Sequence, residues 1–301
     1  MEYETSVDHV LQYLSQPELC SLAFSDYREI DAGDKIHACR RNDEDLGRVV
    51  SKKLEKYGFA IVKLNSPDPS RKDILDIANI LDLGNPFVPP YFKNFSGSIE
   101  VQRGINAITA INISDSDSRH TAFGTGKEQG LHVDGTLQQI GDIKTSIVLC
   151  ETPSNMGGLS TIFNSTAAFA KLIEENRDWA TSMLNRSALE RFASHDRANP
   201  YIGPVFSLVD GTFVTRYSVD DVTSWENGFK NIKYLRNAYD FFKSCVCEGS
   251  PFYKEILLDR GDMLIMANSR ISHGRTGYVD SEKLQRKMYR ALFEKYPVHE
   301  Q

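Results

Sequence analysis

The segment DRGDMLIMANSRISHGR, residues 259–275, contains the pattern on which the fold assignment depends. An acidic turn with a glycine precedes the apolar run Met263–Ala267, and polar residues then lead to His273. A short apolar run that is bounded by turn residues is typical of a buried β-strand. The segment therefore predicts a strand at 262–267, followed closely by a candidate metal ligand, His273.

Similar apolar runs predict strands along most of the chain. Asp210-Gly211 lies between two of them and is a strong hairpin signal. The other predicted strands are 59–64, 105–113, 131–134, 144–150, 159–164, 203–209, 212–217, 255–258 and 286–295.

Helical periodicity is confined to fewer segments. It predicts a helix from Leu46 to Tyr57 that ends at Gly58, and a second one at 71–83. Two more helices are expected within 165–190, and another at 231–247. Strands joined by short turns, with helices gathered early and in one central insertion, indicate a mainly β protein with flanking helices (α+β). An antiparallel sandwich or jelly roll is the arrangement that fits.

The chain shows no internal repeat and no low-complexity linker, so we expect a single domain over residues 1–301. Residues 1–57 would be a helical elaboration, and about 58–296 the core, with helical insertions near 165–190 and 231–247. Regular alternation of strand and helix is missing, as are Gly-x-Gly-x-x-Gly and Walker loops. The usual sequence features of ATP or NAD binding are therefore absent.

Composition narrows the class of protein further. With 35 basic and 41 acidic residues the net charge is −6, which argues against a nucleic-acid surface. No apolar run reaches the roughly 20 residues needed to cross a bilayer. The N-terminus lacks the basic and apolar regions of a secretory leader. Five cysteines, without metal-type spacing, predict reduced thiols and a cytoplasmic location.

Two histidines and one carboxylate form a candidate metal site. In His132-Val133-Asp134 the first and third side chains would share one face of a strand and could converge on one ion. About one such pair is expected by chance in a chain with 7 His and 41 acidic residues, so the pair alone is weak. With His273 it would complete a two-histidine, one-carboxylate triad, which leaves three positions of an octahedron open.

Cationic and small residues add to this pattern. Arg286 and Arg290 are an even distance apart on a predicted strand, so both can face one side. An arginine that points into an apolar interior is costly unless it meets an anion, and a guanidinium suits a carboxylate. Gly157-Gly158 precede a strand on which Thr161 could donate its hydroxyl to the same carboxylate. The alternatives are that the two arginines belong to a solvated edge strand and that the glycines form an ordinary turn.

In this order and spacing, the residues resemble the iron(II)/2-oxoglutarate-dependent oxygenases, in particular the taurine dioxygenase-like and clavaminate synthase-like superfamily. The resemblance extends from about Gly130 to Phe293, and His273-Gly274-Arg275 is similar to the clavaminate synthase and amino-acid hydroxylase branch. It implies a double-stranded β-helix, a distorted jelly roll, with the iron at its open end.

The resemblance also implies a role for each matching residue. His132, Asp134 and His273 would ligate Fe(II), with 2-oxoglutarate and O2 as cosubstrates. Arg286 would bind the distal carboxylate of 2-oxoglutarate, with Thr161, or Ser160 if the alignment shifts by one residue, beside it. The implied reaction hydroxylates an unactivated C–H bond and releases succinate and CO2, although desaturation and ring closure share the same chemistry. Because halogenating relatives lack the carboxylate ligand, Asp134 argues against halogenation.

The resemblance says less about the substrate. Acidic residues near 220 meet a cationic substrate group in the amino-acid hydroxylases, so Asp220 or Asp221 would bind an amine, unless both belong to a solvated turn. Arg290 would hold either the cosubstrate or a substrate carboxylate. The loop 124–130 would cover the pocket. The expected substrate is a small polar molecule such as a free amino acid or a derivative.

Two alternatives remain at this point. One is another metal-dependent enzyme on the same barrel, such as a hydrolase or isomerase, although a zinc hydrolase has no use for a buried Arg286. The other is a non-catalytic module that binds a metabolite. Neither nucleic acid nor membrane is an expected partner, and the sequence leaves the oligomeric state open.

Overall fold

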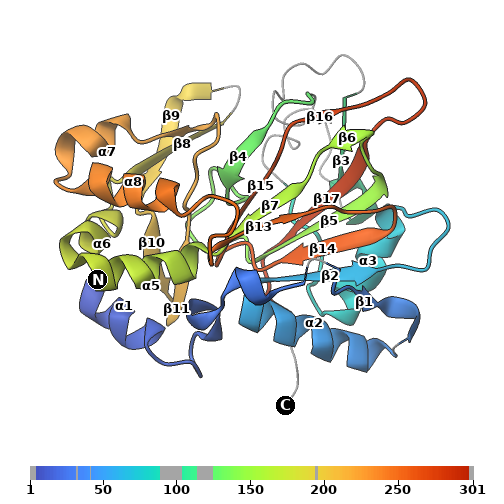
Figure 1. Ribbon diagram of the computed structural model, residues 1–301, viewed down its shortest axis with the longest axis horizontal. Helices are drawn as coiled ribbons and strands as arrows, with labels where there is room; N and C mark the ends of the chain where they lie inside the picture. Colours follow the sequence, from blue (N-terminus) through green and yellow to red (C-terminus); the bar gives the residue numbers. More distant parts are fainter. Residues whose placement is uncertain are drawn as a thin grey trace.

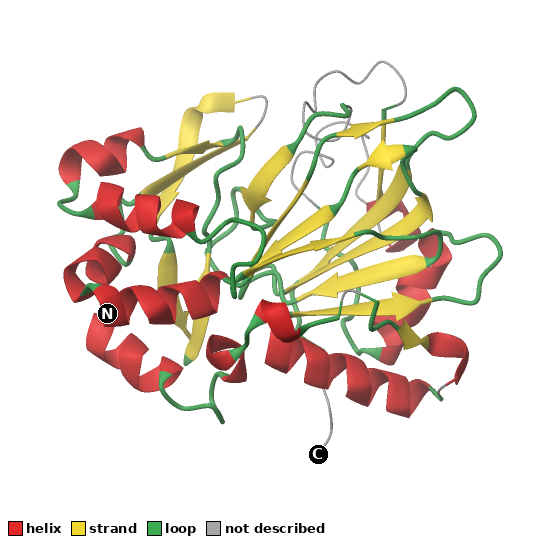
Figure 2. Cartoon of the chain, viewed as in Figure 1, coloured by secondary structure: helices red, strands yellow, loops and turns green. Residues whose placement is uncertain are grey.

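The computed structural model describes residues 5–31, 33–40, 42–88, 104–113, 125–193 and 196–297. Its two main β-sheets lie on one side of the molecule, and most of its helices lie on the other, together with smaller groups of strands (Figures 1 and 2). In the described part of the chain, no helix is both long enough and apolar enough to span a membrane.

Two sheets form the strand-rich side. The larger sheet has six strands in the order β1 (Ile36–His37), β2 (Phe59–Lys63), β14 (Asp262–Met266), β5 (Thr145–Thr152), β17 (Lys287–Phe293) and β3 (Thr109–Asn112). The smaller has four antiparallel strands in the order β13 (Tyr253–Ile256), β7 (Ser160–Phe163), β15 (Ser272–Arg275) and β4 (Gln129–His132). Only the short β1–β2 pair of the six-stranded sheet is parallel.

Smaller strand groups complete the β structure. The hairpin β10 (Phe206–Val209) and β11 (Thr212–Thr215) turns at Asp210 and Gly211, both with positive φ. A three-stranded sheet has the order β12 (Thr223–Ser224), β8 (Leu189–Ala193) and β9 (Asp196–Gly203). The pair β16 (Tyr278–Val279) and β6 (Met156–Gly157) lies beyond the ends of the main strands.

Helices pack on both sides of this framework. α2 (Asp43–Tyr57) and α3 (Arg71–Ile80) cover one face of the six-stranded sheet, whereas the others gather beside the hairpin (Figure 1). These others are α1 (Val7–Leu14), α5 (Ser165–Glu175), α6 (Arg177–Met183), α7 (Glu226–Asn231) and α8 (Leu235–Ser244). Short 3-10 turns occupy Ser21–Phe24, Tyr27–Glu29, Ala38–Arg40 and Gly104–Ala107.

Side chains alternate along each strand, so the two faces of the six-stranded sheet contact different parts of the molecule. On β14, Met263 and Ile265 pack with α2 and α3, while Leu264 and Met266 line a pocket on the opposite face. A second core forms among the helices around clustered aromatic rings, including Phe163, Phe206 and Phe242. The sheet is therefore supported from behind and presents its other face to the pocket.

Most predicted elements are present with shifted ends. Gly58 ends α2 in the left-handed conformation, the hairpin at Asp210-Gly211 forms, and the long apolar strands lie where expected. Three predictions need correction. Residues 104–107 form a 3-10 turn before β3 rather than a strand. The strand expected at 131–134 is β4, which ends at His132, and the predicted strand at 203–209 covers the end of β9 and all of β10.

Candidate active site

The two candidate histidines come from neighbouring strands of the four-stranded sheet. His132 is the last residue of β4, and His273, on β15, is its direct partner in the antiparallel register. Their ring centroids are 4.4 Å apart. Directly opposed residues of an antiparallel pair point to the same face, so the register itself brings the two imidazoles together.

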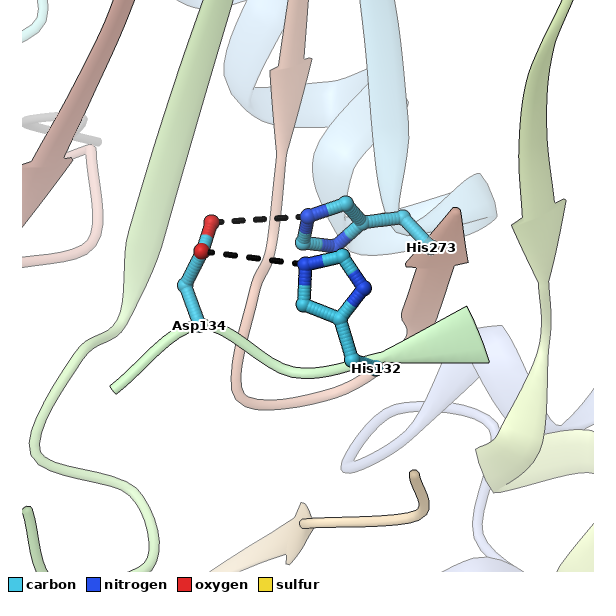
Figure 3. A group of neighbouring side chains, drawn as sticks. All are labelled: His132, Asp134 and His273. Carbon is cyan, nitrogen blue, oxygen red and sulfur yellow. Dashed lines mark ion pairs between the residues drawn. The ribbon is translucent and has the colours of Figure 1, made fainter. Parts of the chain in front are cut away.

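Asp134 lies in the turn after β4, and both imidazoles direct a nitrogen toward its carboxylate (Figure 3). His273 Nε2 is 3.4 Å from Oδ2, and His132 Nε2 is 3.9 Å from Oδ1. One ligand atom from each residue lies within 4.8 Å of the other two, and all three residues are buried. The expectation that Asp134 shares a strand face with His132 is wrong, because the turn, not the strand pleat, directs its carboxylate.

That turn is fixed by the buried side chain of Asn268, which follows β14. Asn268 Oδ1 accepts a hydrogen bond from the Asp134 amide at 2.9 Å. Its Nδ2 donates to the carbonyl oxygens of Asp134, at 3.2 Å, and of Ile143, at 2.8 Å. A polar side chain that satisfies three backbone groups in a buried loop holds the loop in one conformation.

The carboxylate of Asp134 has partners of its own. Ser146 Oγ donates to Oδ2 at 2.8 Å, and Arg290 Nη1 lies 2.6 Å from Oδ1. Burial raises the pKa of Asp134, but Arg290 and His273 outweigh it and hold the pKa well below its ordinary value. The group is therefore ionised at neutral pH, as a metal ligand must be.

His132 is also prepared for ligation. Its Nδ1 is 3.0 Å from the Gly130 carbonyl oxygen, and a hydrogen bond there requires Nδ1 to carry the proton. The lone pair is then on Nε2, the atom that faces Asp134. Burial, together with the neighbouring His273, lowers the pKa of His132 to about 4, so the ring is neutral at physiological pH. Two imidazoles and one ionised carboxylate on one side of a cavity fit a divalent iron with open positions.

A pocket extends from these residues between the two main sheets. Six of its lining residues are apolar, and its polar groups are the two histidines, Gln129, Ser160 and three arginines. The lining residues are Ile111, Gln129, His132, Val148, Ser160, Ile162, Leu264, Met266, His273, Gly274, Arg275, Arg286, Met288 and Arg290.

The structure distinguishes between the two hydroxyl candidates of β7. Ser160 pairs with Arg275, Ile162 pairs with His273, and all four residues line the pocket. Thr161 alternates to the other face, where it pairs with Glu255 of β13. The prediction that Thr161 faces the pocket is therefore wrong, and the alternative, Ser160, occupies that place.

The predicted arginines occupy two places in the pocket. Arg290 lies at the metal site against Asp134. Arg286 is buried, its guanidinium carbon lies 5.0 Å from the ring centroid of Tyr278, and it makes no ion pair with any described residue. Burial lowers the pKa of Arg286. A buried guanidinium in such surroundings is prepared to bind an anion.

The two acidic residues suggested for a substrate amine lie beside the site rather than in the pocket lining. Asp220 Oδ2 is 3.4 Å from Nη2 of Arg191, a residue that is only 1% exposed. Asp221 is exposed, and its backbone carbonyl accepts a hydrogen bond from Arg197. The loop expected to cover the pocket is described from Thr125 on, and Gly124 lies outside the described residues.

Three residues that support the site escaped the sequence analysis: Ser146, Asn268 and Arg191. Arg191 Nη1 donates to the Val133 carbonyl at 3.2 Å and to Ser218 Oγ at 2.6 Å, which joins the ligand turn to the loop before Asp220. Ser146 is a polar residue at the start of a strongly apolar strand, and Asn268 directly follows another. For Ser146 and Asn268, a polar residue next to an apolar run was the signal in the sequence that could have indicated a role in the site.

A buried His-Asp-His cluster beside a pocket between two sheets, with arginines on its wall, defines a non-haem iron oxygenase site. The family model described as "Taurine catabolism dioxygenase TauD, TfdA family" matches residues 26–292. The chain belongs to this family. It is an Fe(II)- and 2-oxoglutarate-dependent dioxygenase, and the predictions of enzyme class, cofactor and cosubstrate are confirmed.

Two curated relatives match nearly the whole chain. A uridine-5'-phosphate dioxygenase from Amycolatopsis sp is 33% identical over 258 residues, which is 85% of this chain and 91% of the relative. A uridine-5'-phosphate dioxygenase from Streptomyces sp is 30% identical over 281 residues, with 91% and 97% covered.

Solved structures of more distant proteins share the fold. Asparagine oxygenase in complex with Fe(II), 2S,3S-3-hydroxyasparagine and succinate superposes with a TM-score of 0.58 at 14% identity, over 83% of this chain and 78% of that one. The non-heme iron oxygenase OrfP in complex with Fe and alpha-ketoglutaric acid gives 0.54 at 16% identity, over 85% and 81%.

Proposed function

We propose that this dioxygenase hydroxylates a nucleoside 5'-monophosphate, with uridine 5'-phosphate as the first candidate. The likeness to two uridine-5'-phosphate dioxygenases carries the proposal, because it spans at least 91% of each relative and is not limited to the iron-binding motif. Bound iron would couple the oxidative decarboxylation of 2-oxoglutarate by O2 to hydroxylation of a substrate C–H bond.

The charges in the pocket argue against a substrate ammonium group, such as that of a free amino acid. The described lining contains three arginines and no carboxylate. Asp134 belongs to the metal site, and Asp220 is engaged by Arg191. A substrate ammonium group would therefore lose its hydration without gaining a carboxylate partner in the described lining, which is unfavourable. A phosphate monoester carries the opposite charge and avoids that cost.

The roles of individual residues form part of the same proposal. His132, Asp134 and His273 would hold Fe(II), Arg286 would bind the distal carboxylate of 2-oxoglutarate, and Ser160 would stand beside it. We further propose that the two main sheets form a double-stranded β-helix within one catalytic domain. The cytoplasmic location stays a prediction.

Succinate release, measured with Fe(II), 2-oxoglutarate and one candidate substrate at a time, tests the substrate class. The panel pairs uridine 5'-phosphate with uridine and adds cytidine 5'-phosphate, asparagine and arginine. We expect uridine 5'-phosphate to be turned over. Uridine should lose at least about 10-fold in kcat/KM, because a charge-assisted contact to the phosphate is missing. Coupled turnover of asparagine or arginine, with none for the nucleotides, would overturn the proposal.

A further inference from the structure

Arg275 is a pocket residue to which the family resemblance assigned no role. It follows His273 by two positions on β15, so both side chains face the pocket, and it lies opposite Ser160 in the strand register. Its exposed fraction is only 6%. Arg275 thus stands one strand repeat, about 7 Å, from a proposed metal ligand and next to the proposed hydroxyl of the cosubstrate site.

Arg275 and Arg286 share the ring of Tyr278. Their guanidinium carbons lie 4.4 Å and 5.0 Å from its centroid, respectively. Neither arginine forms an ion pair with a residue that the structure describes. Two cations held together in a buried pocket repel each other, and an anion bound between them would relieve the cost.

Arg275 also does not use all of its N–H donors. Its Nη2 donates to the carbonyl oxygens of Thr125, at 3.3 Å, and Lys127, at 2.6 Å. Its Nη1 is buried and has no hydrogen-bond partner among the described residues. Asp280 does not supply the missing partner, because neither of its carboxylate oxygens has a hydrogen-bond partner in the described part of the chain. The buried Nη1 therefore offers unused donors to a ligand in the pocket.

We propose that Arg275 is a second arginine for the distal carboxylate of 2-oxoglutarate, and that with Arg286 it selects a dicarboxylic over a monocarboxylic 2-oxo acid. The proposal rests on the assignment of Arg286 to that carboxylate. Arg286 supplies one guanidinium and Arg275 a second from the neighbouring sheet, with Ser160 on the strand that pairs with β15. A carboxylate has enough acceptor sites for both.

A purely structural role for Arg275 predicts something different. The bonds to Thr125 and Lys127 anchor the segment before β4, and loss of that anchor would disturb all ligands of the pocket alike. Arg275→Gln keeps an amide donor but removes the charge and shortens the side chain. The informative quantity is therefore the preference between two ligands, not the affinity for one.

The experiment compares 2-oxoglutarate with 2-oxopentanoate, which has a methyl group in place of the distal carboxylate. Each is titrated anaerobically into the Fe(II)-loaded protein, and binding is followed by the visible metal-to-ligand charge-transfer band. Calorimetry of the Mn(II)-loaded protein gives a second measure. Neither readout needs the hydroxylated substrate, so the result is independent of whether the nucleotide proposal holds.

We expect Arg275→Gln to weaken the binding of 2-oxoglutarate by about 10- to 100-fold, the loss typical of one charged hydrogen bond. The affinity for 2-oxopentanoate should change by less than about 2-fold. Arg286→Gln should show the same selective loss. Arg177→Gln, on exposed α6, is the matched control and should alter neither affinity.

Two outcomes would overturn the inference. If Arg275→Gln weakens both 2-oxo acids equally, Arg275 only anchors the loop. If it leaves both unchanged but weakens uridine 5'-phosphate, Arg275 serves the substrate. If Arg286→Gln lacks the selective loss while Arg275→Gln shows it, the fault lies in the role proposed for Arg286, not in that of Arg275.

Discussion

Asp134 depends on its neighbours more than either histidine does, because a turn rather than a strand presents it. Ser146 Oγ donates to Oδ2 at 2.8 Å and fixes the plane of the carboxylate. We expect Ser146→Ala to weaken metal binding about 10-fold or more, which is the usual cost of losing a partner of a metal ligand. Titration of the metal-free variant with Mn(II) measures the change. An unaltered affinity would mean that Arg290 alone orients the carboxylate.

Arg290 controls the ionisation of the same group. Its guanidinium helps to hold the pKa of Asp134 below the ordinary value, so the carboxylate remains available as the pH falls. Removing the charge in Arg290→Met raises that pKa, and protons then compete with the metal at a higher pH. We expect the midpoint for metal loss on acidification to move upward. Mn(II) affinity measured from pH 5 to 8 provides the comparison, with Arg286→Met, which does not face Asp134, as the control.

At the scale of single residues, sequence reasoning found what strand spacing and residue type can encode. It identified the two histidines, the carboxylate and the arginines, because all are chemically distinctive. It could not distinguish Ser160 from Thr161, since a shift of one residue exchanges the two faces of a strand. Asn268 and Arg191 act through backbone groups, and such contacts exist only once distant segments are folded together.

At the scale of the elements, Gly58 determines where α2 ends. This glycine has φ +75°, and an added Cβ would lie 2.5 Å from Ile271 Cγ2, whereas Gly211 has φ +73° with nothing within 4 Å. Gly211→Ala should therefore cost only the left-handed penalty of about 1–2 kcal/mol. Gly58→Ala should cost an additional 1–3 kcal/mol, roughly, for overpacking. Denaturant unfolding of both variants separates the terms, and equal losses would show that Ile271 simply moves aside.

The elements that the sequence predicted well have strong local patterns. Apolar periodicity and Gly58 define α2, and Asp210-Gly211 defines the β10–β11 hairpin. The strands β8 and β9 were missed. β9, Asp196–Gly203, is polar, largely exposed and contains a proline, so it lacks the apolar run by which other strands were recognised. Pairing with β8, rather than its own composition, makes it a strand.

At the scale of the whole molecule, the pocket joins segments that are far apart in the chain. Asp134 bonds to groups that follow β14, begin β5 and lie in β17, and the cavity is lined by both main sheets. Ligands that bridge these segments bind the folded state alone. Their binding energy must therefore appear as added resistance to unfolding.

Thermal unfolding under anaerobic conditions should show this coupling in two separable steps. A divalent metal at about 100 times its Kd adds roughly 2.7 kcal/mol, or on the order of 4–8 °C for a chain of this size. 2-Oxoglutarate should add a second rise only when metal is present, because it chelates the metal as well as meeting the arginines. Asp134→Ala should lose both rises, whereas Arg286→Gln should retain the first and lose most of the second. A full second rise in Arg286→Gln would contradict the assignment of Arg286 to the distal carboxylate.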